Sequence, residues 1–157
     1  MKTLLKFTAV LAVIAGILMI IGGAWAISFT YQNVSRENII TPSDASIPNT
    51  LVRGPLTLKS QADIIRTHAL RSADGQTYSE MPRQIPKLDK EGNTVLDEEG
   101  NQVMVTNEAR DTWVTATALV TALNLGIITY LFSGLIILLG LISVWTGLIF
   151  YIISKKT

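Results

Sequence analysis

The segment Trp113–Ile153 reads WVTATALVTALNLGIITYLFSGLIILLGLISVWTGLIFYII and contains no charged residue. As one helix rising about 1.5 Å per residue it would be about 60 Å long, roughly twice the hydrocarbon thickness of a bilayer. Hydroxyl and amide side chains interrupt its first part, and Leu, Ile and Phe dominate its second part. Counting back about 20–25 residues from Lys155 predicts a membrane-spanning helix over residues 130–153. We expect residues 112–129 to form a stalk helix outside the membrane, buried against protein.

A second apolar run, residues 7–29, lies near the N-terminus and predicts another spanning helix. A cleaved signal peptide is the alternative, because Ala24-Trp25-Ala26 fits a cleavage site. The uncharged run exceeds the apolar core of about 7–15 residues that signal peptides have, which favours an uncleaved span. The fold class expected is therefore a mainly α membrane protein: a two-helix transmembrane hairpin with a small extracytoplasmic domain.

Charge is distributed unevenly along the chain. All 12 acidic residues lie within residues 30–111. The charged side chains of the two tips, residues 1–6 and 154–157, are all basic: Lys2, Lys6, Lys155 and Lys156. Basic residues that flank membrane spans mark the cytoplasmic side. We therefore expect both termini in the cytoplasm and residues 30–111 outside the plasma membrane. The overall net charge of +1 gives no indication of nucleic-acid binding.

Small residues recur at regular spacing in both predicted spans, and such residues let helix backbones approach closely. Ala12 and Gly16 are four apart, Gly16 and Gly23 are seven apart, and Gly140 and Gly147 are seven apart. The spacing predicts helix-packing seams, either between the two spans or, through the Ala12 and Gly16 face, between two copies of the chain.

The extracytoplasmic domain is expected to contain one short helix followed by a proline-rich strap. Ser60 as the cap, with Asp63 as its capping-box partner, predicts a helix over residues 61–72. Its apolar face contains Ala62, Ile65 and Ala69. The prolines within residues 76–87 exclude a helix there, and Asn107 is the expected cap of the stalk helix.

Residues 88–95 and 96–103 form an internal duplication, LDKEGNTV followed by LDEEGNQV. Gly92 and Gly100 would supply the positive φ of a tight turn in each copy, so the repeat predicts two hairpin turns joining three short strands. A calcium-binding loop is the alternative, but Thr94 stands where an EF-hand requires glycine, and Gly100 where it requires glutamate.

Residues that could support catalysis are scarce. His68 is the only histidine, cysteine is absent, and no nucleophile or second ligand is spaced to act with His68. The two spans carry no charge that could form an ion path. We therefore expect no catalytic, cofactor-binding or metal-binding residue and no cofactor. An enzyme with a hidden extracytoplasmic site that uses Asp63 and His68 is the alternative.

Several short motifs resemble a family of small actinobacterial two-span membrane proteins. The motifs are Gly54-Pro55, Gln61-Ala62-Asp63-Ile64-Ile65, His68-Ala69-Leu70 and Gly75-Gln76-Thr77-Tyr78 with Glu80. The resemblance covers the spans and roughly residues 54–82, and it does not include the duplication. Many family members are described as aromatic-ring-opening dioxygenases, which implies iron ligands. The single histidine and the lack of a facial triad speak against that activity in this chain.

Members of that family occur as accessory subunits, or association factors, of the respiratory supercomplex that joins cytochrome bcc to the aa3-type oxidase. The resemblance implies a non-catalytic accessory subunit, with cytochrome bcc and aa3 oxidase subunits and lipid as its partners. It also implies family-motif roles for Gln61, Asp63, His68 and Tyr78. The alternative is a homo-oligomeric envelope or sensor protein.

Overall fold

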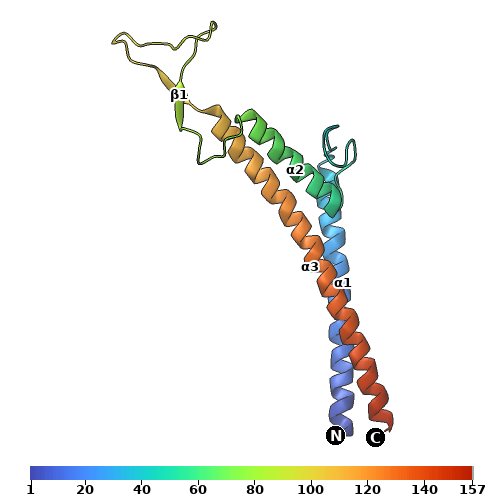
Figure 1. Ribbon diagram of the computed structural model, residues 1–157. Helices are drawn as coiled ribbons and strands as arrows, with labels where there is room; N and C mark the ends of the chain where they lie inside the picture. The colour runs from blue at the N-terminus through green and yellow to red at the C-terminus, as the bar shows by residue number, and fades with distance from the viewer. Residues whose placement is uncertain (157) are drawn as a thin grey trace.

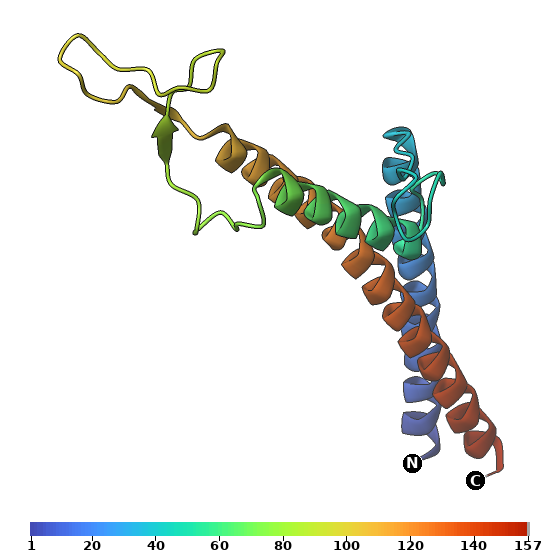
Figure 2. The ribbon, with the colours of Figure 1, turned by 45° about the horizontal axis from the view of Figure 1, so that its top comes forward.

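The computed structural model describes residues 1–156 and is elongated and mainly helical (Figure 1). Helix α1 (Lys2–Arg36) and helix α3 (Glu108–Lys156) run antiparallel, so that the N- and C-termini lie at the same end of the molecule. Helix α2 (Pro55–Ser72) lies along the N-terminal half of α3 in both views (Figure 2). Residues 84–106 extend beyond the N-terminal end of α3 (Figure 1).

Helix α3 is uninterrupted from Glu108 to Lys156, including the segment around Asn124. The sequence contains no proline in this range, so no backbone donor is missing from the helix interior. Hydroxyl side chains donate to carbonyls one turn back, as Thr129 does to Leu125 at 2.9 Å. Two long apolar helices of this kind, α1 and α3, could each cross a membrane by their length and composition.

The ends of α3 have the residues that its backbone dipole favours. Asn107 Oδ1 accepts the backbone N–H of Ala109 at 3.1 Å, which confirms Asn107 as the N-cap. Acidic Glu108 and Asp111 lie in the first turn, and Lys155 and Lys156 lie in the last. Negative charge near the N-terminus and positive charge near the C-terminus both stabilise a helix.

The contact between α1 and α3 follows a seven-residue repeat of small side chains. The buried residues of α1 are Ala9, Gly16, Gly23 and Thr30, and those of α3 along its C-terminal half are Ser133, Gly140, Gly147 and Ser154. Each step of seven along α1 is matched by a step of seven back along α3. A repeat of 3.5 residues per turn keeps two helices in contact when they wind around each other with a left-handed supercoil.

The glycines in this seam bring the two backbones into direct contact. A Cβ placed on Gly16 would lie 2.6 Å from the carbonyl oxygen of Gly140, and a Cβ on Gly140 would lie 2.7 Å from that of Gly16. Gly147 faces the Ala9 carbonyl in the same way, and Gly23 faces that of Ser133. The Ser143 hydroxyl also donates to the Ala12 carbonyl at 2.9 Å. The seam therefore joins the two helices of one chain.

Helix α2 begins earlier than the sequence analysis predicted. It starts at Pro55 in the N1 position, with Gly54 as the N-cap, because proline needs no hydrogen-bond partner in the first turn and has a helical φ. The Thr57 hydroxyl accepts the backbone N–H of Gly54 at 3.1 Å. The prediction of Ser60 as the cap and Asp63 as its partner is therefore wrong.

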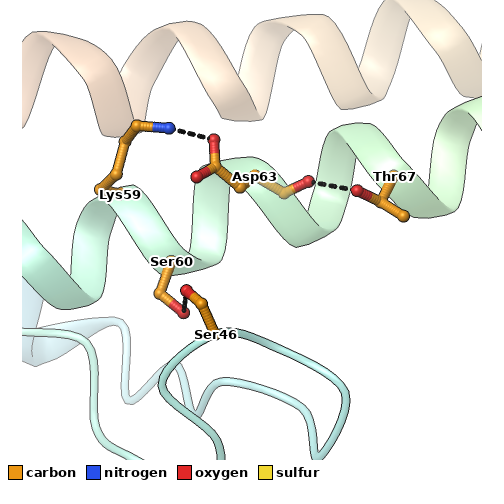
Figure 3. Close-up of polar contacts among 5 residues, drawn as sticks. All are labelled: Ser46, Lys59, Ser60, Asp63 and Thr67. Atoms are coloured by element: carbon orange, nitrogen blue, oxygen red, sulfur yellow. Dashed lines mark hydrogen bonds and ion pairs between the residues drawn. The ribbon is translucent and has the colours of Figure 1, made fainter.

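Ser60 instead lies buried inside α2, where its hydroxyl joins the helix to the preceding loop (Figure 3). Ser46 Oγ donates to Ser60 Oγ at 3.0 Å, and the Ile47 backbone N–H donates to the same oxygen at 2.9 Å. The loop over residues 39–52 therefore packs against the first turns of α2.

The apolar face of α2 packs on the N-terminal half of α3 in two clusters. Ala62 and Ala69 are buried and Ile65 is partly buried, which confirms the predicted face. Leu58 packs beside Gly126, where an added Cβ would lie 3.2 Å from the leucine methyl group. Trp113 packs with Ala69 and Met81, and in this way holds the C-terminal end of α2 against α3.

The duplicated segment, residues 88–103, contains isolated bridges in place of the three predicted strands. Strand β1 (Gln84–Pro86) pairs antiparallel with β2 (Met104–Thr106), on either side of the duplication. Each copy closes on itself through a single bridge, Leu88 with Thr94 and Leu96 with Gln102. The prediction of three strands is therefore wrong. Each copy has eight residues, and the turn takes up so many of them that only a single bridge forms.

The glycine seam predicts a position-dependent response to a single added methyl group. Changing Gly16 or Gly140 to alanine should destabilise the α1–α3 pair by about 1–3 kcal/mol, because the methyl group meets the opposite backbone. The same change at Gly22 or Gly134 meets nothing within 4 Å and should leave the stability almost unchanged. Thermal unfolding in detergent, followed by circular dichroism, would measure the difference, and equal effects at all four positions would contradict the seam.

Candidate functional site

A groove runs between α2 and α3 and is closed at one end by the C-terminal turn of α1. It consists of two adjoining hollows of about 580 and about 630 Å³, which share Ile65 and Leu119 in their linings. Further residues that line this α2–α3 groove are Gln61, His68 and Ser72 from α2, Asp111, Thr115 and Ala122 from α3, Asn33 from α1, and Glu37, the C-cap of α1.

The middle of the α2–α3 groove is apolar and its ends are acidic. Ile65, Leu119 and Ala122 line the middle, whereas Glu37 and Asp111 lie toward opposite ends. No lysine or arginine of residues 1–156 is among the lining residues. Gln61 Oε1 is buried at this surface without a hydrogen-bond partner in the described chain. A buried acceptor without a donor costs free energy.

The motif residues Asp63 and His68 do not contact each other, and each has another partner. Lys59 forms an ion pair with Asp63 one turn earlier in α2 (Figure 3), and the Thr67 hydroxyl donates to the Asp63 carbonyl at 2.9 Å. His68 Nε2 lies 2.8 Å from Asp44 Oδ2. That hydrogen bond lowers the pKa of the Asp44 carboxyl. Both pairs are exposed. The first joins two successive turns of α2, and the second joins α2 to the loop that precedes it.

Tyr78 anchors the segment between α2 and β1 through Arg110. The Arg110 guanidinium lies over the Tyr78 ring, 3.9 Å from its centroid, and donates to the carbonyls of Tyr78 at 3.1 Å and Met81 at 2.5 Å. Asn107 adds a donor to the Pro82 carbonyl at 3.0 Å. The planar guanidinium both stacks and donates, so the first turns of α3 hold the proline-rich segment in place.

The two turns of the duplication are built alike. Gly92 has φ 87° and Gly100 has φ 83°, both in the left-handed region. Asp89 Oδ1 accepts the backbone N–H groups of Glu91 and Asn93, and Asp97 Oδ1 accepts those of Glu99 and Asn101. These hydrogen bonds, above all those from Asn93 and Asn101, lower the pKa of each carboxyl.

The helix-packing residues Ala12, Gly16, Gly23, Gly140 and Gly147 all lie along the α1–α3 contact. The groove residues on α3 and α1 carried no signal in the sequence. The stripe of α2 residues 61, 65, 68 and 72 follows a helical period, but the period alone does not say which helix lies beside it. Among residues 1–156, no group of three or more His, Asp or Glu side chains is arranged to hold a metal ion.

Comparisons with protein-family models, curated proteins and solved structures give no match for this chain.

The Arg110 contacts predict a specific loss of order. Replacing Arg110 with lysine removes the stacking fork and should increase amide hydrogen exchange over residues 77–86, while α2 and the α1–α3 pair keep their protection. Exchange measured by mass spectrometry would show this. Arg83→Ala is the control, because the structure uses only the backbone carbonyl of Arg83 there. Equal exchange in the two variants would contradict the anchoring role.

The two aspartate turns predict a pH dependence. Because the folded-state pKa values of Asp89 and Asp97 are lowered, the turns are fully stabilised above the ordinary pKa of an aspartate. The stabilisation is lost as the pH falls through the lowered folded-state values. Carboxyl titration by NMR should therefore give midpoints below that of an unstructured aspartate at both positions. Asp89→Ala removes the side-chain acceptor of the Asn93 N–H, so it should release the amide protection of Asn93 at neutral pH and leave that of Asn101 unchanged. An ordinary midpoint at either carboxyl would contradict the turn geometry.

Proposed function

We propose that this chain is a two-pass membrane protein, with both termini in the cytoplasm and residues 30–111 outside the plasma membrane. In the most apolar window of each long helix only 11% of residues are buried within the chain, which suits helices surrounded by lipid and not the core of a soluble protein. The four basic residues of the tips lie at the end of the molecule where the termini meet (Figure 1), as positive residues on the cytoplasmic side would.

The observation that carries the proposal further is the exposed, uncharged surface of the stalk, residues 112–129. Helix α2 covers one stripe of it, which includes Trp113, Ala116 and Leu123. Val114, Leu119 and Leu125 remain 53%, 50% and 58% exposed. A helix outside the membrane with exposed apolar side chains on more than one face is poorly solvated, and such surface is suited to protein contacts.

The protein is accordingly a non-catalytic accessory subunit of a larger membrane complex. The resemblance of its motifs, from Gln61 to Tyr78, to the actinobacterial two-span family favours the bcc–aa3 respiratory supercomplex as that complex. In this role α1 and α3 fill a cleft beside catalytic subunits, and the stalk with α2 ties their extracytoplasmic surfaces together. Cytochrome bcc and aa3 oxidase subunits are the protein partners, and lipid covers the rest of the spans.

A homo-oligomer built through the Ala12 and Gly16 face is less favoured by the geometry. Gly16 already packs on Gly140, and the Ala12 carbonyl accepts the Ser143 hydroxyl. A second copy would need a different surface, so the accessory-subunit proposal explains more of the exposed apolar area.

Gentle-detergent purification of the tagged full chain from its native membranes tests the proposal. Haem-containing subunits should co-migrate with the chain, as absorbance spectra and mass spectrometry would show. The double variant Val114→Lys with Leu125→Lys should lower the haem recovered by about tenfold or more, since two buried apolar contacts are replaced by charges. Gln102→Lys, at an exposed position in the duplicated segment, is the control. Migration as a clean homo-oligomer without haem would overturn the proposal.

A further inference from the structure

We propose that the α2–α3 groove is the docking site for a single helix of a partner protein, a helix whose apolar stripe is flanked at both ends by lysine or arginine. The inference rests on the proposed function in one respect, because it takes residues 30–129 to lie outside the membrane among partner subunits. It adds to that function the position of the contact and the chemistry of the bound segment.

The shape of the groove is the first argument. Helices α2 and α3 run antiparallel and touch along one stripe of each, so the valley beside that contact is bordered by two parallel rows of side chains. Gln61, Ile65 and His68 form the row on α2, and Thr115, Leu119 and Ala122 form the row on α3. Both rows follow spacings of three and four residues, which is the spacing at which a third helix packs into such a valley.

The length of the groove sets the length of the occupant. Helix α2 has 18 residues and is therefore about 27 Å long. The two adjoining hollows extend along it from Glu37, at the end of α1, to Asp111, in the first turn of α3. A helix of about four turns fills this length, and a helix of that length presents four or five side chains on one face.

The charges of the groove determine what the ends of the occupant carry. Glu37 and Asp111 lie toward opposite ends, and no lysine or arginine of residues 1–156 lines the space between them, where His68 is already paired with Asp44. Complementary charge on the occupant is basic at both ends. An anionic lipid headgroup is disfavoured for the same reason, since it would lie next to carboxylates.

The unpartnered acceptor of Gln61 adds a requirement in the hollow next to the end of α1. Its Oε1 atom is buried and receives no hydrogen bond within the described chain. Because the partly exposed Gln61 side chain lines the groove, rotation of its amide brings this oxygen to a hydroxyl, amide or basic side chain on the occupant. Gln61 is therefore the polar contact that sets the register of an otherwise apolar helix.

Site-specific photo-crosslinking in native membranes tests the proposal. A benzophenone amino acid replaces Leu119, in the groove, or Leu125, which is exposed to a similar extent (50% against 58%) but does not line it. The Leu119 adduct should map, by mass spectrometry of its peptides, to one helical segment with an apolar stripe and a basic residue at each end. An adduct with lipid, with a second copy of the chain or with a segment lacking that pattern overturns the proposal. So does the absence of a Leu119 adduct while the complex remains intact.

Variants that remove the negative charge at the two ends of the groove separate this inference from the proposed function. Glu37→Gln with Asp111→Asn should lower the Leu119 adduct yield by about fivefold at low salt, because two exposed ion pairs with the occupant are lost. The Leu125 adduct should be unaffected. Glu91→Gln with Glu98→Gln, on the distant turns, is the matched control. An unchanged Leu119 yield overturns the inference, whereas loss of the haem-containing subunits from the wild-type preparation overturns the proposed function.

A second variant tests the register contact without removing charge. Gln61→Leu should raise the melting temperature of the isolated full chain, because a buried acceptor without a partner is removed. The same variant should lower the Leu119 adduct yield, because the occupant's donor then lacks its acceptor. A yield equal to that of the wild type would show that no donor reaches Gln61 and would overturn this part of the proposal.

Discussion

The structure depends on one close approach, the contact between the backbones of α1 and α3 through residues that have no side chain. At Gly16 and Gly140 the space for even a methyl group is taken by the opposite carbonyl. In lipid, apolar side chains gain little by leaving one apolar environment for another, so dispersion contacts between close backbones are what hold two helices together. The seven-residue recurrence of Gly16, Gly23, Gly140 and Gly147 extends this contact over several turns.

This seam also places α2. Since α1 and α3 are fixed along the C-terminal half of α3, the N-terminal half diverges from α1 and leaves a gap that α2 fills (Figure 2). Leu58 enters beside Gly126, and the Tyr130 hydroxyl donates to the Arg53 carbonyl at 2.7 Å just before α2 begins. Helix α2 packs into the space where α1 and α3 diverge but does not fill it. The α2–α3 groove is the part of that space that remains open.

The sequence predicted some parts of this arrangement well. Uncharged runs and helical periods are strong local signals, so the two long helices, the unbroken α3 and the buried face with Ala62 and Ala69 follow from them. The start of α2 was mispredicted because Gly54-Pro55 is both a loop signal and a good helix start. Ser60, the predicted cap, instead accepts a hydrogen bond from Ser46, 14 residues away in sequence.

The groove and the Arg110 anchor could not be predicted, because both depend on pairs distant in sequence. Nothing near Arg110 indicates that its guanidinium meets Tyr78, 32 residues earlier. Gln61 was identified only through a family resemblance, and its physical peculiarity, a buried oxygen without a donor, became visible when α1, α2 and α3 were placed together.

The continuity of α3 has a mechanical consequence. From Gly140, where it is pressed against α1, to Glu108 the helix extends about 48 Å as one rod. A change of about 5° in the crossing angle at the glycines would displace the far end by about 4 Å, by the geometry of a rod of that length. The helix therefore acts as a lever, so that a small rotation where the two helices cross becomes a displacement of the whole outer segment.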